Sequence, residues 1–257
     1  VLIGNCEVAL QVRCSAPVGH ISVKLCDVAP DGTSTLITRG MLDLEQRGVW
    51  PSDPFGVVGA SEQPITPGEW MDLRLQFEAT TWTLLPDHRM RVAISGTDWP
   101  NCWPPSQPFT LHVRRRSVRL VMSTAKSLPR ARDVFEPGVG PSETDATGVE
   151  WRYEHDVLQR ETRVHSRYGG DYDGNNGTKI RDLYEGSLGV STADLSHAWA
   201  KGTARFDLTF PEVGTCTVEA TLNMRSDREW FYVDIALRAD QNGEVVGERQ
   251  WIERFAR

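Results

Sequence analysis

Two tryptophans and three prolines lie close together in the stretch SGTDWPNCWPP, residues 95–105. Trp99 and Trp103 follow an alternating, strand-like run, and the prolines restrict the backbone of the loop that carries them. Indole rings on a rigid loop have two chemical uses. They can stack on a sugar ring, to which Trp82 could add a third indole, or they can pack against a neighbouring domain. Residue spacing alone leaves these two uses balanced.

A second stretch, DYDGNNG at residues 171–177, has oxygen-bearing side chains at alternate positions, as at the start of a calcium-binding loop. The match is incomplete, because Asn176 stands where such a loop needs glycine and Asp182 where it needs glutamate. Asp, Asn and Gly also favour the positive φ angles of an ordinary hairpin loop. We therefore expect a plain loop, with Asp171, Asp173 and Asn175 as a weak calcium candidate.

Motifs of enzymatic catalysis are absent from the sequence. There is no Gly-x-Ser-x-Gly nucleophile elbow and no helical pattern to follow one. The six histidines form no His-Glu-x-x-His motif and no close grouping with Cys or Asp, and no phosphate-binding glycine loop occurs. We expect no catalytic residue and no cofactor in this chain, which alone would then not be an enzyme.

The overall charge argues against nucleic acid or an anionic membrane as a partner. Lys and Arg number 28 against 35 Asp and Glu, which gives a net charge of −7. The one basic run, residues 114–116, is expected at a solvated strand end. No stretch approaches the roughly eighteen apolar residues of a membrane-spanning helix.

The five cysteines contain no Cys-x-x-Cys pair, so neither a zinc site nor a disulfide framework is indicated. Buried free thiols in a reducing compartment fit better, and we expect the protein to be cytoplasmic. The first residues, VLIGNCEVALQV, resemble a strand rather than a signal peptide. We expect the chain to be a piece of a longer protein.

Period-two alternation of apolar and polar residues dominates the chain and predicts an all-β fold. Residues 1–122 are expected to form a jelly-roll β-sandwich of the galactose-binding type. Residues 123–148, rich in Pro and Gly, are expected to be a linker or strap. Residues 149–257 are expected to form an antiparallel meander or half-barrel, with a type I′ hairpin turn at Asn242-Gly243.

Two long segments, VKLCDVAPDGTSTLITRGMLDL (23–44) and PGEWMDLRLQFEATTWTLLPDHRMRVAISGTDWPNCWP (67–104), resemble the C-terminal domain of the CocE/NonD hydrolases. That family is related to the X-Pro dipeptidyl-peptidases. The matching elements are Cys-Asp-Val before a Pro-Asp-Gly turn, then Thr-Arg-Gly, Pro-x-His-Arg-x-Arg and Ser-Gly-x-Asp-Trp-Pro. Residues 151–257 are similar, more loosely, to a C-terminal extension of some bacterial members.

The resemblance implies a Ser-His-Asp triad in a separate α/β-hydrolase domain of the same parent polypeptide, a hydrolase of ester or X-Pro peptide bonds. The jelly roll would pack against that domain through Asp98, Trp99, Pro100 and Trp103. His88 and Arg89 would tie this corner by hydrogen bonds. The competing hypothesis is a stand-alone carbohydrate-binding module that uses Trp99 and Trp103. A homo-oligomer is also compatible with the sequence.

Overall fold

The computed structural model describes residues 1–47, 63–124 and 148–257. The chain divides into two compact units, Val1–Val134 and Phe135–Arg257. The described residues form strands, short 3₁₀ turns and loops, which confirms the all-β prediction. In these parts of the chain, no helix is long and apolar enough to cross a bilayer.

The predicted linker, residues 123–148, falls almost wholly on residues 125–147, outside the described residues. The predicted domain bounds therefore stay a prediction. The residues just before this gap pair with the start of the chain. The Ile3 N–H donates to the Ser123 carbonyl at 3.1 Å, and Leu2 forms a β-bridge with Thr124.

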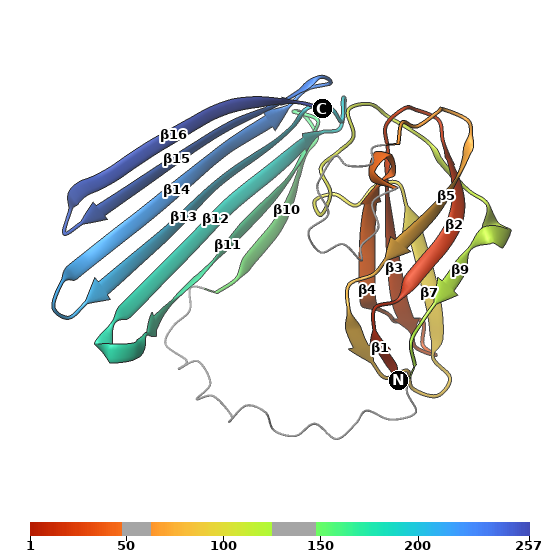
Figure 1. Ribbon diagram of the computed structural model, residues 1–257, viewed down its shortest axis with the longest axis horizontal. Helices are drawn as coiled ribbons and strands as arrows, with labels where there is room; N and C mark the ends of the chain where they lie inside the picture. The colour runs from red at the N-terminus through yellow and green to blue at the C-terminus, as the bar shows by residue number, and fades with distance from the viewer. Residues whose placement is uncertain (48–62, 125–147) are drawn as a thin grey trace. The chain divides into compact units, whose positions relative to one another are not determined.

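The first unit is a β-sandwich (Figure 1). One sheet has the order β5-β2-β8, with β9 also paired to β2, and the other has the order β4-β3-β7. A short pair, β1-β6, completes the described strands of this unit. The elements are β1 (Leu2–Gly4), β2 (Glu7–Cys14), β3 (His20–Val28), β4 (Ser34–Asp43), η1 (Leu44–Gln46), β5 (Trp70–Gln76), β6 (Thr80–Trp82), β7 (Arg89–Ser95), β8 (Leu111–Val113), η2 (Arg115–Ser117) and β9 (Arg119–Val121).

The sandwich core follows directly from the alternation in the sequence. On β2 every second residue is buried and its neighbours are half-buried, as expected for a strand with one face on a core. Burying each aliphatic side chain of this kind contributes roughly 1.5–3 kcal/mol. The central aliphatic residues come from both sheets: Val8, Leu10, Val12, Ile21, Val23, Leu25, Leu73 and Leu75.

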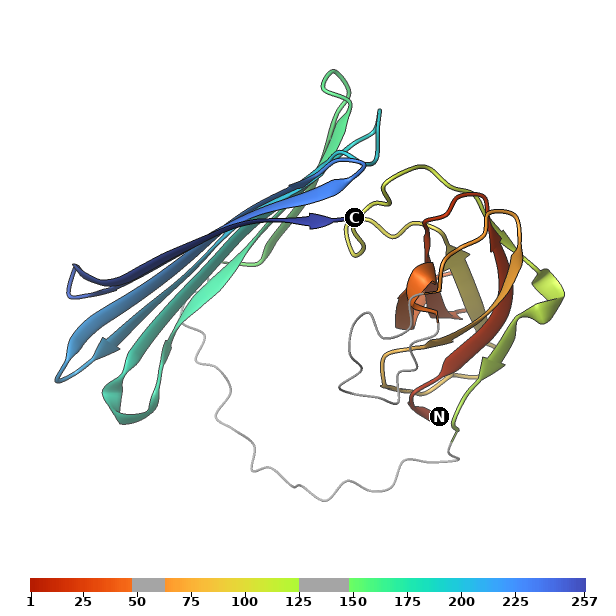
Figure 2. The ribbon, with the colours of Figure 1, turned by 45° about the horizontal axis from the view of Figure 1, so that its top comes forward.

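The second unit is one antiparallel sheet of seven strands in sequence order, β10 to β16 (Figures 1 and 2). This confirms the predicted meander, and β10 and β16 form its two edges. The Asn242-Gly243 turn between β15 and β16 has φ values of 54° and 85°, as a type I′ turn requires. The elements are β10 (Glu150–Asp156), β11 (Glu161–Asp173), η3 (Asn175–Gly177), β12 (Lys179–Ser191), β13 (Ala198–Phe210), β14 (Gly214–Ser226), β15 (Trp230–Gln241) and β16 (Glu244–Ala256).

The strand register makes this sheet amphipathic, because residues directly opposite one another in neighbouring strands share a face. A typical row of one face, here called the apolar face, is Val164, Leu188, Ala200, Met224 and Val233. The adjacent row lies on the other face, here called the polar face: Arg163, Gly189, Trp199, Arg225 and Tyr232.

All five cysteines are free. Cys6 and Cys14 are buried, as predicted, whereas Cys26, Cys102 and Cys216 are half-buried. Burial raises the pKa of the Cys6 thiol, which disfavours the reactive thiolate.

Candidate docking corner and polar sites of the sheet

The tryptophan stretch forms a corner directly after β7, and Asp98 anchors it. The Asp98 side chain is only 7% exposed and is 2.8 Å from Lys24 Nζ. Ser22 Oγ donates to it at 2.7 Å and Asn101 Nδ2 at 3.2 Å. Since Ser22 and Lys24 belong to β3, these bonds fix the corner to the sandwich.

The electrostatics of Asp98 favour the ionised carboxylate. Burial raises the pKa of this group, but the hydrogen bonds from Lys24, Ser22 and Asn101 outweigh burial. The pKa of Asp98 therefore lies below its ordinary value of 3.8. The backbone adds a further bond, from the Cys102 N–H to the Asp98 carbonyl at 2.9 Å.

Trp99, Pro100 and Trp103 are half-buried, and Pro104 is buried. Both tryptophans take part in interactions within the chain. Each retains some exposed surface, so the corner offers parts of two indole rings held on a well-anchored loop. The predicted interdomain contact of these residues stays a prediction at this point.

A second buried carboxylate, Asp27, lies toward the other end of β3. Trp82 Nε1 donates to Asp27 at 2.9 Å, and His88 Nδ1 is 2.8 Å from it. Hydrogen bonds from Trp82 and His88 lower the pKa of Asp27 against the opposing effect of burial.

This second cluster shows that one expectation, the role of His88, is wrong, and it also argues against the alternative of a three-tryptophan platform. His88 does not tie the tryptophan corner, since it precedes β7 whereas the corner follows β7. Trp82 does not extend a platform with Trp99 and Trp103, because its ring packs on the sandwich core and its indole N–H binds Asp27.

The weak calcium candidate lies at the end of a long hairpin, as expected, but Asp171 and Asp173 belong to strand β11 and not to the loop. Asp171 and Asp173 are the last alternate residues of β11, directly opposite Arg181 and Lys179 of β12. Asp171 is 3.6 Å from Arg181. These carboxylates therefore face cations, which compete with a metal ion for them.

The turn itself has the geometry that its composition favours. Asn176 and Gly177 have φ values of 62° and 75°, and the Gly174 N–H donates to the Thr178 carbonyl at 2.7 Å. Among the described residues, no group of three or more His, Cys, Asp or Glu side chains is arranged for a metal ion.

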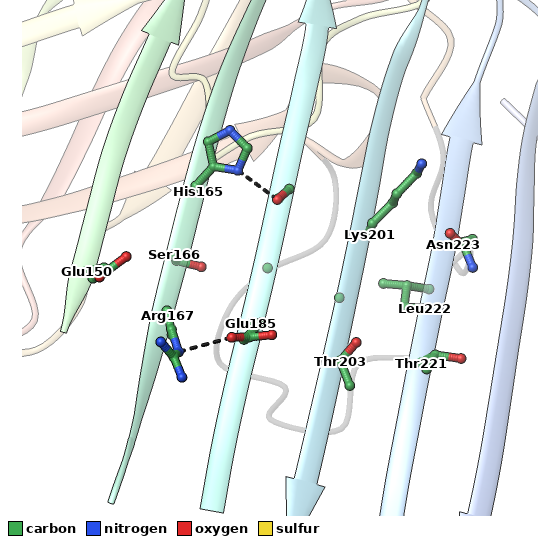
Figure 3. A pocket seen from close by; sticks show the side chains of 13 residues that line it. Glu150, His165, Ser166, Arg167, Glu185, Lys201, Thr203, Thr221, Leu222 and Asn223 are labelled. Carbon is green, nitrogen blue, oxygen red and sulfur yellow. Dashed lines mark hydrogen bonds and ion pairs between the residues drawn. The ribbon is translucent and has the colours of Figure 1, made fainter. Parts of the chain in front are cut away.

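The register brings together a Ser-His-Glu trio that the sequence did not reveal. His165 Nδ1 is 2.9 Å from Ser187 Oγ, and His165 Nε2 is 3.5 Å from Glu154. His165 and Ser187 line an open depression of about 510 Å³, which also includes Gly186 and Gly202 (Figure 3). Only a known register could have shown this, because the three residues come from three different strands.

This trio lacks the surroundings of a serine nucleophile. Ser187 lies within β12, which is paired with strands on both sides, so its neighbouring N–H groups are used in the sheet. An oxyanion hole needs unpaired donors aimed at the developing charge. Figure 3 also shows Arg167 and Glu185 in the same depression, joined by an ion pair of 3.0 Å. Among the described residues, this geometry therefore lacks what acyl transfer requires.

Comparison with known proteins gives a family for the first unit. Residues 1–134 match the model of the X-Pro dipeptidyl-peptidase C-terminal non-catalytic domain, and no curated protein matches the chain. The match covers more than half of the 257 residues and includes both buried aspartate clusters. It confirms the resemblance carried by residues 23–44 and 67–104, whereas the looser resemblance of residues 151–257 stays a prediction. The chain therefore belongs to the X-Pro dipeptidyl-peptidase C-terminal non-catalytic domain family, whose members are accessory domains of peptidase-type hydrolases.

Proposed function

We propose that this chain is the non-catalytic C-terminal region of a serine hydrolase and packs against an α/β-hydrolase catalytic domain of the same polypeptide. The family match over residues 1–134 is the observation that carries the proposal. The parent enzyme would hydrolyse acyl esters or X-Pro peptide bonds. The five free cysteines favour a reducing compartment, and we place the enzyme in the cytoplasm.

The proposed contact is the corner of Asp98, Trp99, Pro100 and Trp103. Its rigidity supports this role, because a loop that is already ordered loses little conformational entropy on docking. The partly exposed indole rings supply apolar area. Burying the remaining surface of one ring contributes on the order of 1–2 kcal/mol.

Substitution of Trp103 in the parent hydrolase tests the contact. An interface residue stabilises the full-length enzyme more than the chain alone, so Trp103→Ala should lower the free energy of unfolding more in the parent. The matched control is Trp70→Ala, which removes a 39% exposed tryptophan on β5. Chemical denaturation of both proteins gives the comparison. Equal losses in parent and chain would contradict an interdomain role for Trp103.

Two further measurements separate the proposal from its alternatives. A fluorophosphonate probe should leave this chain unlabelled and label the catalytic domain of the parent. Tryptophan fluorescence should stay flat when oligosaccharides are added to the chain. A glycan-dependent change that Trp103→Ala abolishes would instead support the carbohydrate-binding module.

A further inference from the structure

A groove of about 1110 Å³ crosses the polar face of the second-unit sheet, over β13 to β16. Its lining residues are ordered by the strand register. Trp199, Arg225, Tyr232 and Arg254 form one row, and Lys201 and Asn223 begin the next row on the same face. The groove therefore combines two aromatic rings with three cationic side chains.

Both rings are held in place by contacts with neighbouring residues of the sheet and its loops. The Trp199 ring lies against the backbone of Gly189, where a Cβ atom would come within 2.4 Å of it. Trp199 Nε1 donates to Glu161 at 3.1 Å. The Tyr232 hydroxyl donates to Asp227 at 2.9 Å. A ligand would thus meet rings that are already fixed, which reduces the entropic cost of binding.

The cations of the groove contact rings instead of carboxylates. The Arg225 guanidinium carbon is 3.7 Å from the Tyr232 ring centroid, and the Arg254 carbon is 4.3 Å from that of Trp230. Lys201 Nζ lies 5.6 Å from the Trp199 ring centroid. Stacking on a ring leaves the N–H edge of a guanidinium open for an oxyanion.

Other arginines of the same face differ from those of the groove, because each has a carboxylate within 4 Å. These paired arginines are Arg152, Arg163, Arg167, Arg181, Arg205 and Arg238. Among the residues that the structure describes, no ion pair joins a carboxylate to Lys201, Arg225 or Arg254.

The carboxylates beside the groove are committed to structural bonds. Glu161 accepts hydrogen bonds from Arg163 and Trp199. Asp227 accepts from Tyr232 and from the backbone N–H groups of Glu229 and Trp230, and these bonds lower its pKa. Asp234, which also lines the groove, accepts from Gln250 Nε2 at 2.9 Å. The acids on this face of the groove are thus engaged by other groups, which leaves Lys201, Arg225 and Arg254 available to an anionic ligand.

We propose that this groove binds a small ligand in which a flat ring carries a carboxylate or phosphate group. The oxyanion is bound by Arg225 and Lys201, and the ring stacks on Trp199. Arginine matches both oxyanions with two parallel hydrogen bonds, and indole faces favour planar rings. This inference does not depend on the proposed docking of the first unit.

Isothermal titration calorimetry of the chain tests the proposal with two probes, phenyl phosphate and benzoate. At least one of them should bind, and the stronger one identifies the oxyanion. Inorganic phosphate and phenol, which each carry half of the proposed chemistry, should bind at least about tenfold more weakly. Raising the salt concentration should weaken binding, because the contacts are charged and exposed.

Variants locate the site. Arg225→Gln and Lys201→Gln should each weaken binding about tenfold or more, since each removes a charge-assisted hydrogen bond. Arg238→Gln, at a paired arginine of the same face, is the matched control and should change affinity less than twofold. Two groove variants are used in case one of them fails to fold. Thermal melting shows whether each variant is folded.

No binding of either probe, equal binding of inorganic phosphate, or an equal effect of Arg238→Gln would each overturn the proposal. Selective loss in the Arg225 and Lys201 variants would establish it.

Discussion

Asp98 is the residue on which the tryptophan corner depends. Asp98→Asn removes the charge that pairs with Lys24 while keeping the size of the side chain. Because hydrogen bonds to a charged group contribute about 1.5–3 kcal/mol, we expect the free energy of unfolding at neutral pH to fall by about 1–3 kcal/mol. Urea denaturation measures this loss. Asp72→Asn, at an exposed position of β5, is the control.

The stability difference between the wild type and Asp98→Asn should also depend on pH. The folded-state pKa of Asp98 lies below 3.8, so its ionised form stabilises the fold at higher pH. This contribution is lost as the pH falls through the folded-state pKa. Below about pH 4, the stability of the wild-type chain should therefore fall more steeply than that of Asp98→Asn. Parallel curves would show that Asp98 does not contribute in this way.

His20, on β3, should make the free energy of unfolding depend on pH in a second, higher range. Burial lowers the pKa of His20 below 6.5, although Asp43 and Asp98 partly oppose the shift, and its Nε2 atom is buried with no hydrogen-bond partner among the described residues. The unfolded chain then binds a proton at higher pH than the folded chain does. The free energy of unfolding should consequently fall as the pH decreases from 6.5 toward the folded-state pKa.

His20→Gln should reduce this slope, which denaturant titrations between about pH 7 and pH 5 can measure. His112→Gln removes an exposed histidine of β8 and is the control. A slope that persists in His20→Gln would assign the effect to other groups.

At the scale of elements, the contact between the two sheets of the sandwich explains why position 40, in the segment 23–44, is a glycine. Gly40 is buried on β4, and a Cβ atom there would lie 2.4 Å from a Leu75 side-chain atom and 2.7 Å from the Gln76 carbonyl. Because the backbone carbonyl cannot easily move aside, Gly40→Ala should destabilise the sandwich by about 1–3 kcal/mol. Thermal or urea unfolding measures the loss. Gly32→Ala is unsuitable as a control, since its positive φ adds backbone strain.

Gly247, on β16, offers a matched control for this test. A Cβ atom there meets nothing within 4 Å, and the residue has no positive φ. Gly247→Ala should leave stability within about 0.5 kcal/mol of the wild type. If Gly40→Ala behaves in the same way, the two sheets adjust more easily than the close contact implies.

The strands could be predicted from the sequence because burial on one face imposes a period of two, as on β2. The Asn242-Gly243 turn was also predictable, because its φ angles are a local requirement. The positions of His88 and Trp82 were not, since both bind Asp27 from distant parts of the chain. The groove at Arg225 was equally hidden, because it depends on register across four strands.

At the scale of the whole molecule, the second unit leaves apolar surface exposed. Ile235, Leu237 and Phe255, which share the apolar face, are 36%, 37% and 54% exposed. Extended apolar patches on soluble proteins mark interaction surfaces. Light scattering would decide whether a second copy of the chain uses this surface, as the sequence allows.

The central claim is that this chain is an accessory part of a serine hydrolase, and the reading frame upstream of the Val1 codon tests it most directly. We predict a continuous frame of several hundred codons that encodes Gly-x-Ser-x-Gly, followed by the Asp and His of a triad. A start codon or a secretion signal immediately before Val1 would contradict the claim.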